Sequence, residues 1–308
     1  MLKLKRSYVS VTVSLAILAT LPFWIGEFLR DALILFFLYL GAAELLGFMA
    51  KHAGMVSLGQ QIFMGVGGYT TAVLCMYFGV PLFLSAIIAG LLGSGLAAIL
   101  SFPLLKLRGV YFSIGTLLAA EIIRLAFNSW EFVGAGKGLT FRSAYGISTI
   151  YIYYSTLALG IISIFLVYIA YHSKLGFGLR SIGADEDAAS GLGVNTFICK
   201  ASCFVLASLI TTFVGAVYAV HHTYLHPTSA FSLSWTVNFL FVAVIGGVGT
   251  IIGPVIGSFI FVALGYLLSQ YLGLSLLLEG LVVLAILLAV PEGLWGFISR
   301  KIKLKPPL

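Results

Sequence analysis

The sequence carries very little charge for its length. Charged residues make up 9% of the 308 positions, and only ten residues are acidic. Soluble globular domains carry about 25% charged residues, so this composition excludes an ordinary soluble enzyme or binding domain. The chain is instead rich in apolar residues, which make up 61% of it and give a mean hydropathy of +1.12. We therefore expect a membrane protein.

Reactive residues are also scarce. The three cysteines lie in or beside apolar runs, and their odd number gives no disulfide framework. His222 and His226 have the spacing of one helical face, but Pro227 follows at once and no carboxylate or Cys is nearby to complete a metal site. The sequence also lacks an HExxH motif, a Ser-His-Asp or Cys-His grouping and paired carboxylates in a water-accessible context. We predict no catalytic residue, no metal site and no directly bound cofactor.

Long apolar runs fill most of the chain. A helix crosses the hydrocarbon layer of about 30 Å in about 20 residues, and continuous runs are typical of such helices rather than of barrel strands. The predicted fold class is all-α: a polytopic membrane protein with a single transmembrane domain over residues 1–308. About ten spans are expected, some of them short or broken, at residues 7–26, 31–50, 54–79, 81–104, 109–130, 149–172, 197–221, 233–248, 251–270 and 277–296.

The basic residues predict the orientation of these spans. Loops on the cytoplasmic side carry an excess of Lys and Arg near the helix ends. With ten spans and both termini cytoplasmic, Arg30, Lys137 and Arg142 lie outside. The cytoplasmic group is much larger: Lys3, Lys5, Arg6, Lys51, Lys106, Arg108, Lys174, Arg180, Lys200, Arg300, Lys301, Lys303 and Lys305. The net charge of +7 then reflects topology and contact with anionic lipid, so no nucleic-acid partner is needed.

The cytoplasmic loop at residues 173–196 is the longest water-compatible stretch. It holds Asp185, Glu186 and Asp187, three of the ten acids. Carboxylates in the first turn of a helix interact favourably with its dipole, which predicts a short exposed helix here. The small residues Ala188, Ala189 and Gly191 would leave its surface smooth. We expect this helix to contact a soluble partner.

Glycine and a pair of opposite charges mark candidate sites inside the spans. Small residues let helices approach closely in lipid, and the 35 glycines lie mainly in the apolar runs. Around 246–254 the short runs predict a helix that stops or re-enters beside a transport path. Glu121 and Arg124 share one helix face and neutralise each other. Two interpretations of this pair stay open, a role in helix packing and a role in lining the path.

Five segments resemble one known family. The stretches Ala53 to Tyr69 (AGMVSLGQQIFMGVGGY) and Leu107 to Arg124 (LRGVYFSIGTLLAAEIIR) are similar to signatures of the branched-chain amino-acid ABC transporter permeases, M-type subunit. Further similarity lies in Gly176 to Asn195, in the Pro-x-x-x-Phe of 225–231 and in the GGxGTxxGPxxG block of 244–257. The order along the chain matches over roughly residues 30 to 298. Departures occur at Lys51 and His52, and in the outer stretch 133–139 (VGAGKGL).

The resemblance implies a permease subunit in the inner or plasma membrane. Its partners would be a homologous H-type permease, two cytoplasmic ATPases that bind the ATP and Mg, and an extracytoplasmic substrate-binding protein. The residues implied in ATPase coupling are Arg180, Asp185, Glu186, Asp187, Ala188, Ala189, Gly191 and Gly193. The pathway or helix-packing candidates are Ser57, Gly59, Gly67, Gly68, Tyr69, Thr116, Glu121, Arg124, Gly246, Gly247, Gly249, Gly253 and Pro254.

Alternatives remain for both the substrate and the mechanism. The same importer class carries branched-chain or other small amino acids, urea or short amides. An ion-coupled secondary transporter needs a coupling-ion site and usually matched broken helices in two repeats, and neither is clear in the sequence. A channel needs a ring of selectivity residues and no energy-coupling loop.

Overall fold

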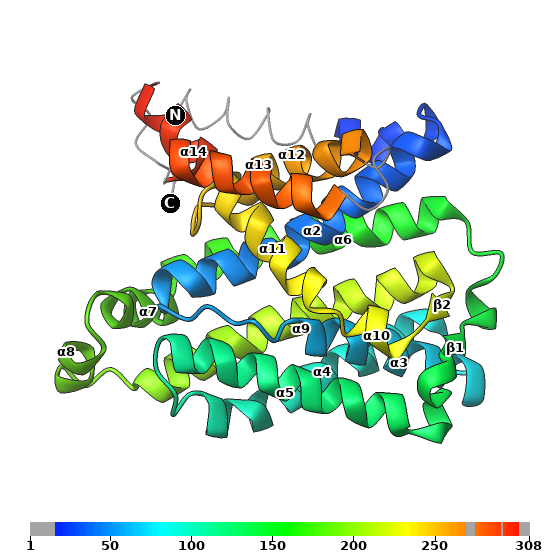
Figure 1. Ribbon diagram of the computed structural model, residues 1–308, viewed down its shortest axis with the longest axis horizontal. Coiled ribbons are helices and arrows are strands. Elements are labelled where there is room, and N and C mark those ends of the chain that lie inside the picture. The colour runs from blue at the N-terminus through cyan, green and yellow to red at the C-terminus, as the bar shows by residue number, and fades with distance from the viewer. Residues whose placement is uncertain (1–15, 269–274, 291, 302–308) are drawn as a thin grey trace.

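The computed structural model describes residues 16–268, 275–290 and 292–301 and shows a helical bundle (Figure 1). A two-stranded antiparallel pairing, β1 (Leu139–Thr140) with β2 (Tyr224–Leu225), closes one end. The helices are α2 (Glu27–His52), α3 (Gln61–Tyr77), α4 (Leu82–Leu104), α5 (Val110–Ser129), α6 (Thr149–His172), α7 (Lys174–Ala184), α8 (Glu186–Gly191), α9 (Thr196–His222), α10 (Pro227–Ala230), α11 (Leu233–Gly246), α12 (Ile252–Leu268), α13 (Ser275–Ala289) and α14 (Gly293–Lys301). Four short 3-10 turns are η1 (Leu21–Phe23), η2 (Glu131–Val133), η3 (Ala135–Lys137) and η4 (Arg142–Ala144).

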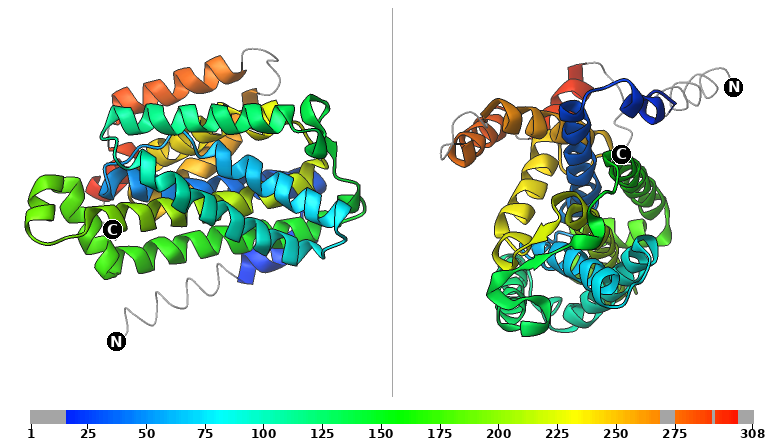
Figure 2. Two further views of the ribbon diagram at one scale, coloured as in Figure 1. Left: turned by 90° about the horizontal axis from the view of Figure 1, so that it is seen from below. Right: turned by 90° about the vertical axis from the view of Figure 1, so that its right-hand side faces the viewer.

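Two long helices, α2 and α9, form the centre of the bundle. Both are apolar along their length and largely buried, and α3, α4, α6 and α11 pack around them. Figure 2 shows that the long helices run along one common direction, with α7 and α8 projecting beyond one end. A helix that is hydrophobic all round is typical of such a buried position.

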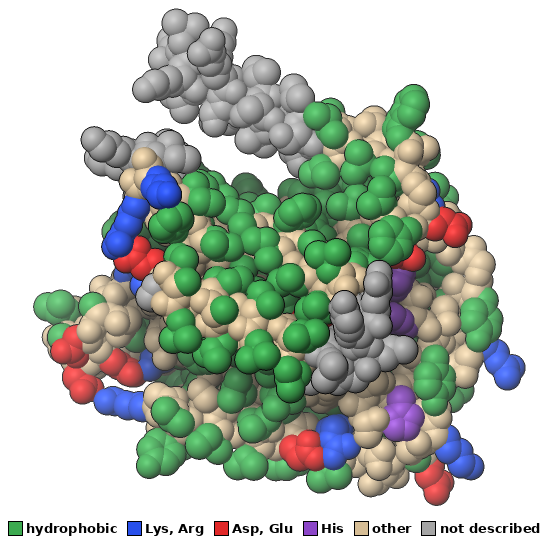
Figure 3. Space-filling view, turned by 45° about the horizontal axis from the view of Figure 1, so that its top comes forward, with side chains coloured by type: hydrophobic (Ala, Val, Ile, Leu, Met, Phe, Trp, Pro, Cys, Tyr) green, Lys and Arg blue, Asp and Glu red, His purple; other side chains and the backbone are tan. Residues whose placement is uncertain are grey.

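The surface has the pattern of a membrane protein. On the face shown in Figure 3, hydrophobic side chains cover the middle and charged side chains gather mainly toward the two ends. Exposed apolar residues such as Phe83, Leu91 and Ile99 lie along α4. In a water-soluble fold an apolar surface of this extent would be exposed to solvent at a cost, so lipid is the medium that fits it.

Most predicted spans match observed helices. Seven helical segments in the described part of the chain are long and apolar enough to cross a membrane: Glu27–His52, Leu82–Leu104, Val110–Ser129, Thr149–His172, Thr196–His222, Pro227–Gly246 and Leu277–Lys301. The shorter α12 covers the expected span at 251–270. Most of the expected span at 7–26, and both chain ends, lie outside the described residues.

The expectation of one continuous span over 54–79 is wrong in its first part. Helix α3 begins only at Gln61, and residues 53–60 are not helical. Several of these residues, including Ser57 and Gly59, are nevertheless buried. We call residues 53–60 the broken segment.

Glycines bring α3 and α9 into backbone contact. A β-carbon on Gly67 would lie 2.0 Å from the carbonyl oxygen of Thr212, and one on Gly215 would lie 2.0 Å from the carbonyl oxygen of Met64. Gly68 lies against Gly215 and Ala219 of the same helix. Gly67 and Gly215 therefore admit hydrogen only, and the close approach of the two helices is a packing device.

Replacing Gly67 with alanine is expected to destabilise the protein, because the added methyl group meets backbone that cannot rotate away. Overpacking of this kind typically costs about 1–3 kcal/mol. The matched control is Gly95→Ala on α4, where a β-carbon meets nothing within 4 Å. Thermal unfolding in detergent should show a lower midpoint for Gly67→Ala and an unchanged or higher one for Gly95→Ala. Equal midpoints for the two variants would contradict the close packing of α3 on α9.

Candidate coupling surface and translocation path

Side chains from other helices satisfy the backbone of the broken segment. The Leu58 amide donates to Thr116 Oγ1 at 3.0 Å, and Ser113 Oγ donates to the carbonyl oxygen of Val56 at 2.6 Å. The Gln61 amide, at the start of α3, donates to Thr236 Oγ1 at 3.0 Å. Irregular backbone at membrane depth is tolerated only where protein or a water-filled cavity shields it. At the broken segment, side chains of α5 and α11 supply this protein shield.

Three predicted candidates meet at this segment. Ser57 and Gly59 lie within it, and Thr116 of α5 contacts it. A β-carbon on Gly59 would lie 2.4 Å from the Thr116 carbonyl oxygen. The sequence motifs that contain these residues are separated by about fifty positions, and the fold brings them together.

Helix α5 is held to the rest of the chain by one narrow stripe. Its buried residues are Phe112, Thr116 and Ala120, which recur at every fourth position. The remaining faces are exposed, and Leu118 and Ile122 are among the exposed apolar side chains. Such an arrangement leaves most of α5 free to contact lipid or another membrane protein.

The predicted Glu121–Arg124 ion pair is present on the exposed side of α5. Arg124 Nε donates to Glu121 Oε2 at 2.9 Å, and a second, shorter contact joins Arg124 Nη2 to Glu121 Oε1. The side chains are 52% (Glu121) and 22% (Arg124) exposed. Since a helix rises about 1.5 Å per residue, Glu121 lies about 17 Å from the start of α5. The pair therefore lies well inside a helix that is long and apolar enough to cross a membrane, and these two hydrogen bonds join residues of α5 alone.

The glycine-rich block after α11 makes a turn that packs against the start of α12, the end of α2 and the start of α14. A β-carbon on Gly246 would meet the carbonyl of Gly253, and Gly249 lies against the Lys51 side chain at the end of α2. Gly247 has φ +125°, a conformation that favours glycine, and Gly293 lies against it. Pro254 is buried in the first turn of α12. These contacts are those of helix packing, one of the two roles predicted for Gly246, Gly247, Gly249, Gly253 and Pro254.

Tyr69 lies near β2, at the end of the bundle opposite the loop at residues 173–196 that holds α7 and α8. Its hydroxyl donates to the carbonyl oxygen of Leu225 in β2 at 3.2 Å, and its ring stacks on Phe231. Phe127 of α5 also contacts both rings. Tyr69 therefore supports the end of the bundle that carries the β-strands and does not meet the broken segment.

The short helix predicted after Asp185 is present as α8. Asp185 is its N-cap, with Oδ1 accepting a hydrogen bond from the Ala188 amide at 3.0 Å. Gly191, its last residue, has open space around it, and the following Leu192 is 84% exposed. Gly193 has φ +86°, which lets the chain turn into α9.

Three details of this loop differ from the sequence analysis. A second helix, α7, precedes α8 and was not predicted; its Gly176, Gly178, Leu179 and Ile182 are buried. Ala189 is buried and does not form part of an exposed smooth surface. Arg180 stacks over the rings of Tyr171 and Phe177 and so helps to fix α7 rather than α8.

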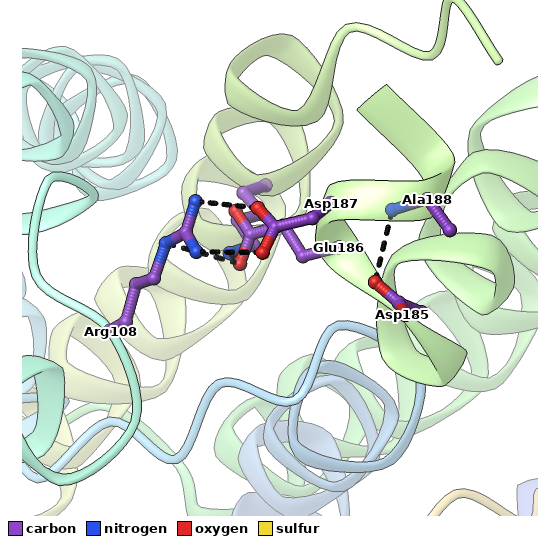
Figure 4. A network of polar contacts seen from close by, with 6 residues as sticks. Arg108, Asp185, Glu186, Asp187 and Ala188 are labelled. Carbon is purple, nitrogen blue, oxygen red and sulfur yellow. Dashed lines mark hydrogen bonds and ion pairs between the residues drawn. The ribbon is translucent and has the colours of Figure 1, made fainter. Parts of the chain in front are cut away.

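Two basic residues complete the acidic cluster of α8. Lys200 Nζ lies 2.6 Å from Glu186 Oε2, and Arg108 Nη2 lies 3.1 Å from Asp187 Oδ1. Figure 4 shows Arg108 reaching both acids while Asp185 turns toward the Ala188 amide. Sequence reasoning counted Arg108 and Lys200 only as topological charges. Three adjacent acids in a chain so poor in acid were the signal that basic partners would lie nearby.

A cavity of about 190 Å³ opens beside this cluster. Gly54 and Met55 of the broken segment, Phe112 of α5, and Arg108 and Lys200 are among its lining residues. It therefore joins the broken segment to the charged end of the bundle. The described residues contain no group of three or more His, Cys, Asp or Glu side chains arranged to hold a metal ion.

Comparison with known proteins identifies the family. The sequence model of one protein family, described as the branched-chain amino acid transport system permease component, matches residues 27–291, which is most of the chain. The chain belongs to this permease family. It is a multi-pass transport permease of the cell membrane and not a member of an enzyme family.

Two curated relatives agree with this assignment. The chain is 26% identical to the high-affinity branched-chain amino acid transport system permease protein LivM of Escherichia coli (strain K12), over 95% of this chain and 76% of the relative. It is 25% identical to the LivM protein of Salmonella typhimurium, over 94% and 75% respectively. The predicted resemblance to M-type permeases is thereby confirmed. No solved structure matches the chain.

Proposed function

We propose that this permease is one of two membrane subunits of an ATP-driven importer of branched-chain or other small amino acids. The proposal rests on two features that occur together. A charged, exposed helix with an N-cap lies at one end of the bundle, and the broken segment lies within the bundle. The exposed helix is α8, and the cavity beside Arg108 and Lys200 connects the two features.

The second membrane subunit in this proposal is a homologous H-type permease that covers α5. Charged side chains facing lipid at membrane depth are costly and are normally found against protein or water. The Glu121–Arg124 pair is partly exposed in this chain, so a partner must shield it. Only a membrane-embedded protein reaches that depth. The path then lies between α5, the broken segment and the partner.

Coupling to ATP is assigned to α8. Two cytoplasmic subunits bind the ATP and Mg, and one of them receives the surface formed by Asp187, Ala188, Gly191 and Leu192. This surface combines a negative first turn, an apolar Leu192 and a glycine with open space around it. An extracytoplasmic binding protein delivers the substrate at the opposite end, near β1 and β2.

The substrate is tested through that binding protein. Urea and short amides remain the second candidate class, because residues 133–139 depart from the family pattern at the end where substrate arrives. Isothermal titration of the binding protein encoded with this permease should show saturable binding of leucine, isoleucine or valine. Binding of urea or a short amide, with no binding of these amino acids, would replace the proposed substrate while leaving the importer class intact.

A further inference from the structure

We propose that Arg108 is a positioning residue that transmits the movement of α8 to α5 and through it to the broken segment. This inference rests on the proposed function, because it assigns α8 to ATPase coupling. It concerns a different question, namely which contact carries the movement into the membrane domain. The proposed route uses the exposed ion pair Arg108–Asp187 and the less exposed pair Glu186–Lys200. It continues through one glycine and two hydroxyl groups of α5.

Arg108 contacts two acidic side chains of α8. Its guanidinium donates from Nη2 to Asp187 Oδ1 at 3.1 Å and from Nη1 to Asp187 Oδ2 at 3.4 Å, and its Nε lies 3.9 Å from Glu186 Oε2. A two-point contact between a planar guanidinium and a carboxylate fixes direction as well as distance. The hydrogen bond with Asp187 raises the pKa of the Arg108 side chain, and a guanidinium is charged at physiological pH in any case.

Lys200 anchors the same turn of α8 to α9. Its side chain is 9% exposed and its ammonium lies 2.6 Å from Glu186, whose side chain is 25% exposed. By contrast, Arg108 and Asp187 are 64% and 79% exposed. Exposed ion pairs contribute little to folding stability. The structure therefore separates an anchor, Glu186–Lys200, from an outer link, Arg108–Asp187, that can be removed without unfolding the chain.

Arg108 lies two residues before the first residue of α5. The residue between, Gly109, is the N-cap of α5 and has φ +56° and ψ −127°. That conformation is one that side-chain-bearing residues rarely adopt, although a β-carbon there would meet nothing within 4 Å. A glycine of this kind at the end of a helix suits a pivot. A displacement of Arg108 therefore moves the first turn of α5, to which it is joined through Gly109.

From α5 the contact continues into the broken segment. Ser113 and Thr116, in the first two turns of α5, hold the Val56 carbonyl and the Leu58 amide. Since α5 is otherwise attached by a narrow buried stripe, it has fewer contacts to resist a shift than α2 or α9. The route from α8 to the broken segment therefore consists of Arg108, Gly109 and these two hydroxyl groups. Contiguity alone does not demonstrate coupling, so the test measures coupling directly.

The experiment is a double-mutant cycle in the full complex, made of this permease, its sister permease, two ATPases and the binding protein. The substitutions are Arg108→Gln, Asp187→Asn and both together, with Lys106→Gln in the same loop as the matched control. The measured quantity is leucine imported per ATP hydrolysed in proteoliposomes. We expect Arg108→Gln to lower this ratio about tenfold, and Asp187→Asn, which also changes the surface offered to the ATPase, to lower it at least as much. The double variant should lose no more than Asp187→Asn alone, since Arg108 then has no Asp187 carboxylate left to hold. Lys106→Gln should leave it unchanged.

Three results would overturn the assignment of Arg108. An unchanged ratio in Arg108→Gln would show that the contact carries no movement. Multiplied losses in the double variant would show that the two residues act independently. Failure of Arg108→Gln to assemble, with normal assembly of Lys106→Gln, would assign the residue to folding. If the unsubstituted complex imports no amino acid with ATP, the proposed function itself fails, which is a different outcome from import that ignores Arg108.

Discussion

Arg124→Ala is expected to prevent stable assembly of the two permeases. The substitution leaves the Glu121 carboxylate without its ion-pair partner, on the face of α5 that the proposed sister subunit would cover. An unpaired carboxylate within a membrane-spanning helix is costly to place against protein or lipid, so we expect most of the sister permease to be lost from the complex. The measurement is the amount of sister permease that co-purifies with this chain from detergent-solubilised membranes.

Two further variants make this result interpretable. Replacing both Glu121 and Arg124 with glutamine should restore much of the assembly, because no unpaired charge remains. Arg142→Ala, which removes an arginine from the turn η4, should leave co-purification unchanged. Normal co-purification of Arg124→Ala would mean that the partner does not cover this face of α5.

Gly191→Trp is expected to uncouple ATP hydrolysis from transport. A β-carbon at Gly191 meets nothing within 4 Å, so the indole is accommodated by this chain and projects from the end of α8. There it blocks the proposed fit of α8 into the ATPase. Leucine import should therefore fall to the level measured without ATP, while the thermal unfolding midpoint of the purified permease stays the same.

The control for this variant is Gly191→Ala, which adds only a methyl group in open space. It should import at a normal rate. Gly191→Trp that assembles with its ATPases and imports normally would remove α8 from the coupling surface, and a lowered unfolding midpoint would show that the indole acts on folding instead.

The sequence predicts the continuous helices well. The predicted span at 149–172 coincides with α6. The span at 81–104 differs from α4 by one residue at its start, and the span at 109–130 differs from α5 by one residue at each end. These helices have uninterrupted apolar runs bounded by turn-forming residues, and lipid leaves a polypeptide few other conformations. Ser148 before α6 accepts a hydrogen bond from the Ile150 amide, which explains the sharp start.

The broken segment could not be located this way. Hydropathy reports which residues lie in the membrane. Several of residues 53–60 are buried, but their backbone is held by Thr116, Ser113 and other side chains distant in sequence. A helix whose hydrogen bonds are all local is visible in a window of sequence, whereas an irregular segment held by distant partners is not. The resemblance to a family signature marked this stretch as special without revealing its conformation.

The loop at residues 173–196 was predicted only in part, because some of its contacts are local and others come from distant helices. The Asp185 cap is a local feature, and the short helix after it follows from local propensity. The partners of Glu186 and Asp187 come from α9 and from the turn before α5, so only the fold assigns them. The burial of Ala189 likewise depends on how α8 lies against its neighbours.

Reconstitution tests most directly the proposal that this permease moves amino acids only as part of an ATP-driven complex. Proteoliposomes containing the permease, its proposed sister subunit and two ATPases are compared with proteoliposomes containing this chain alone. We expect leucine import by the complex that requires both ATP and the loaded binding protein, and no import by the chain alone. Import by the chain alone, driven by an ion gradient and independent of ATP, would contradict the proposal.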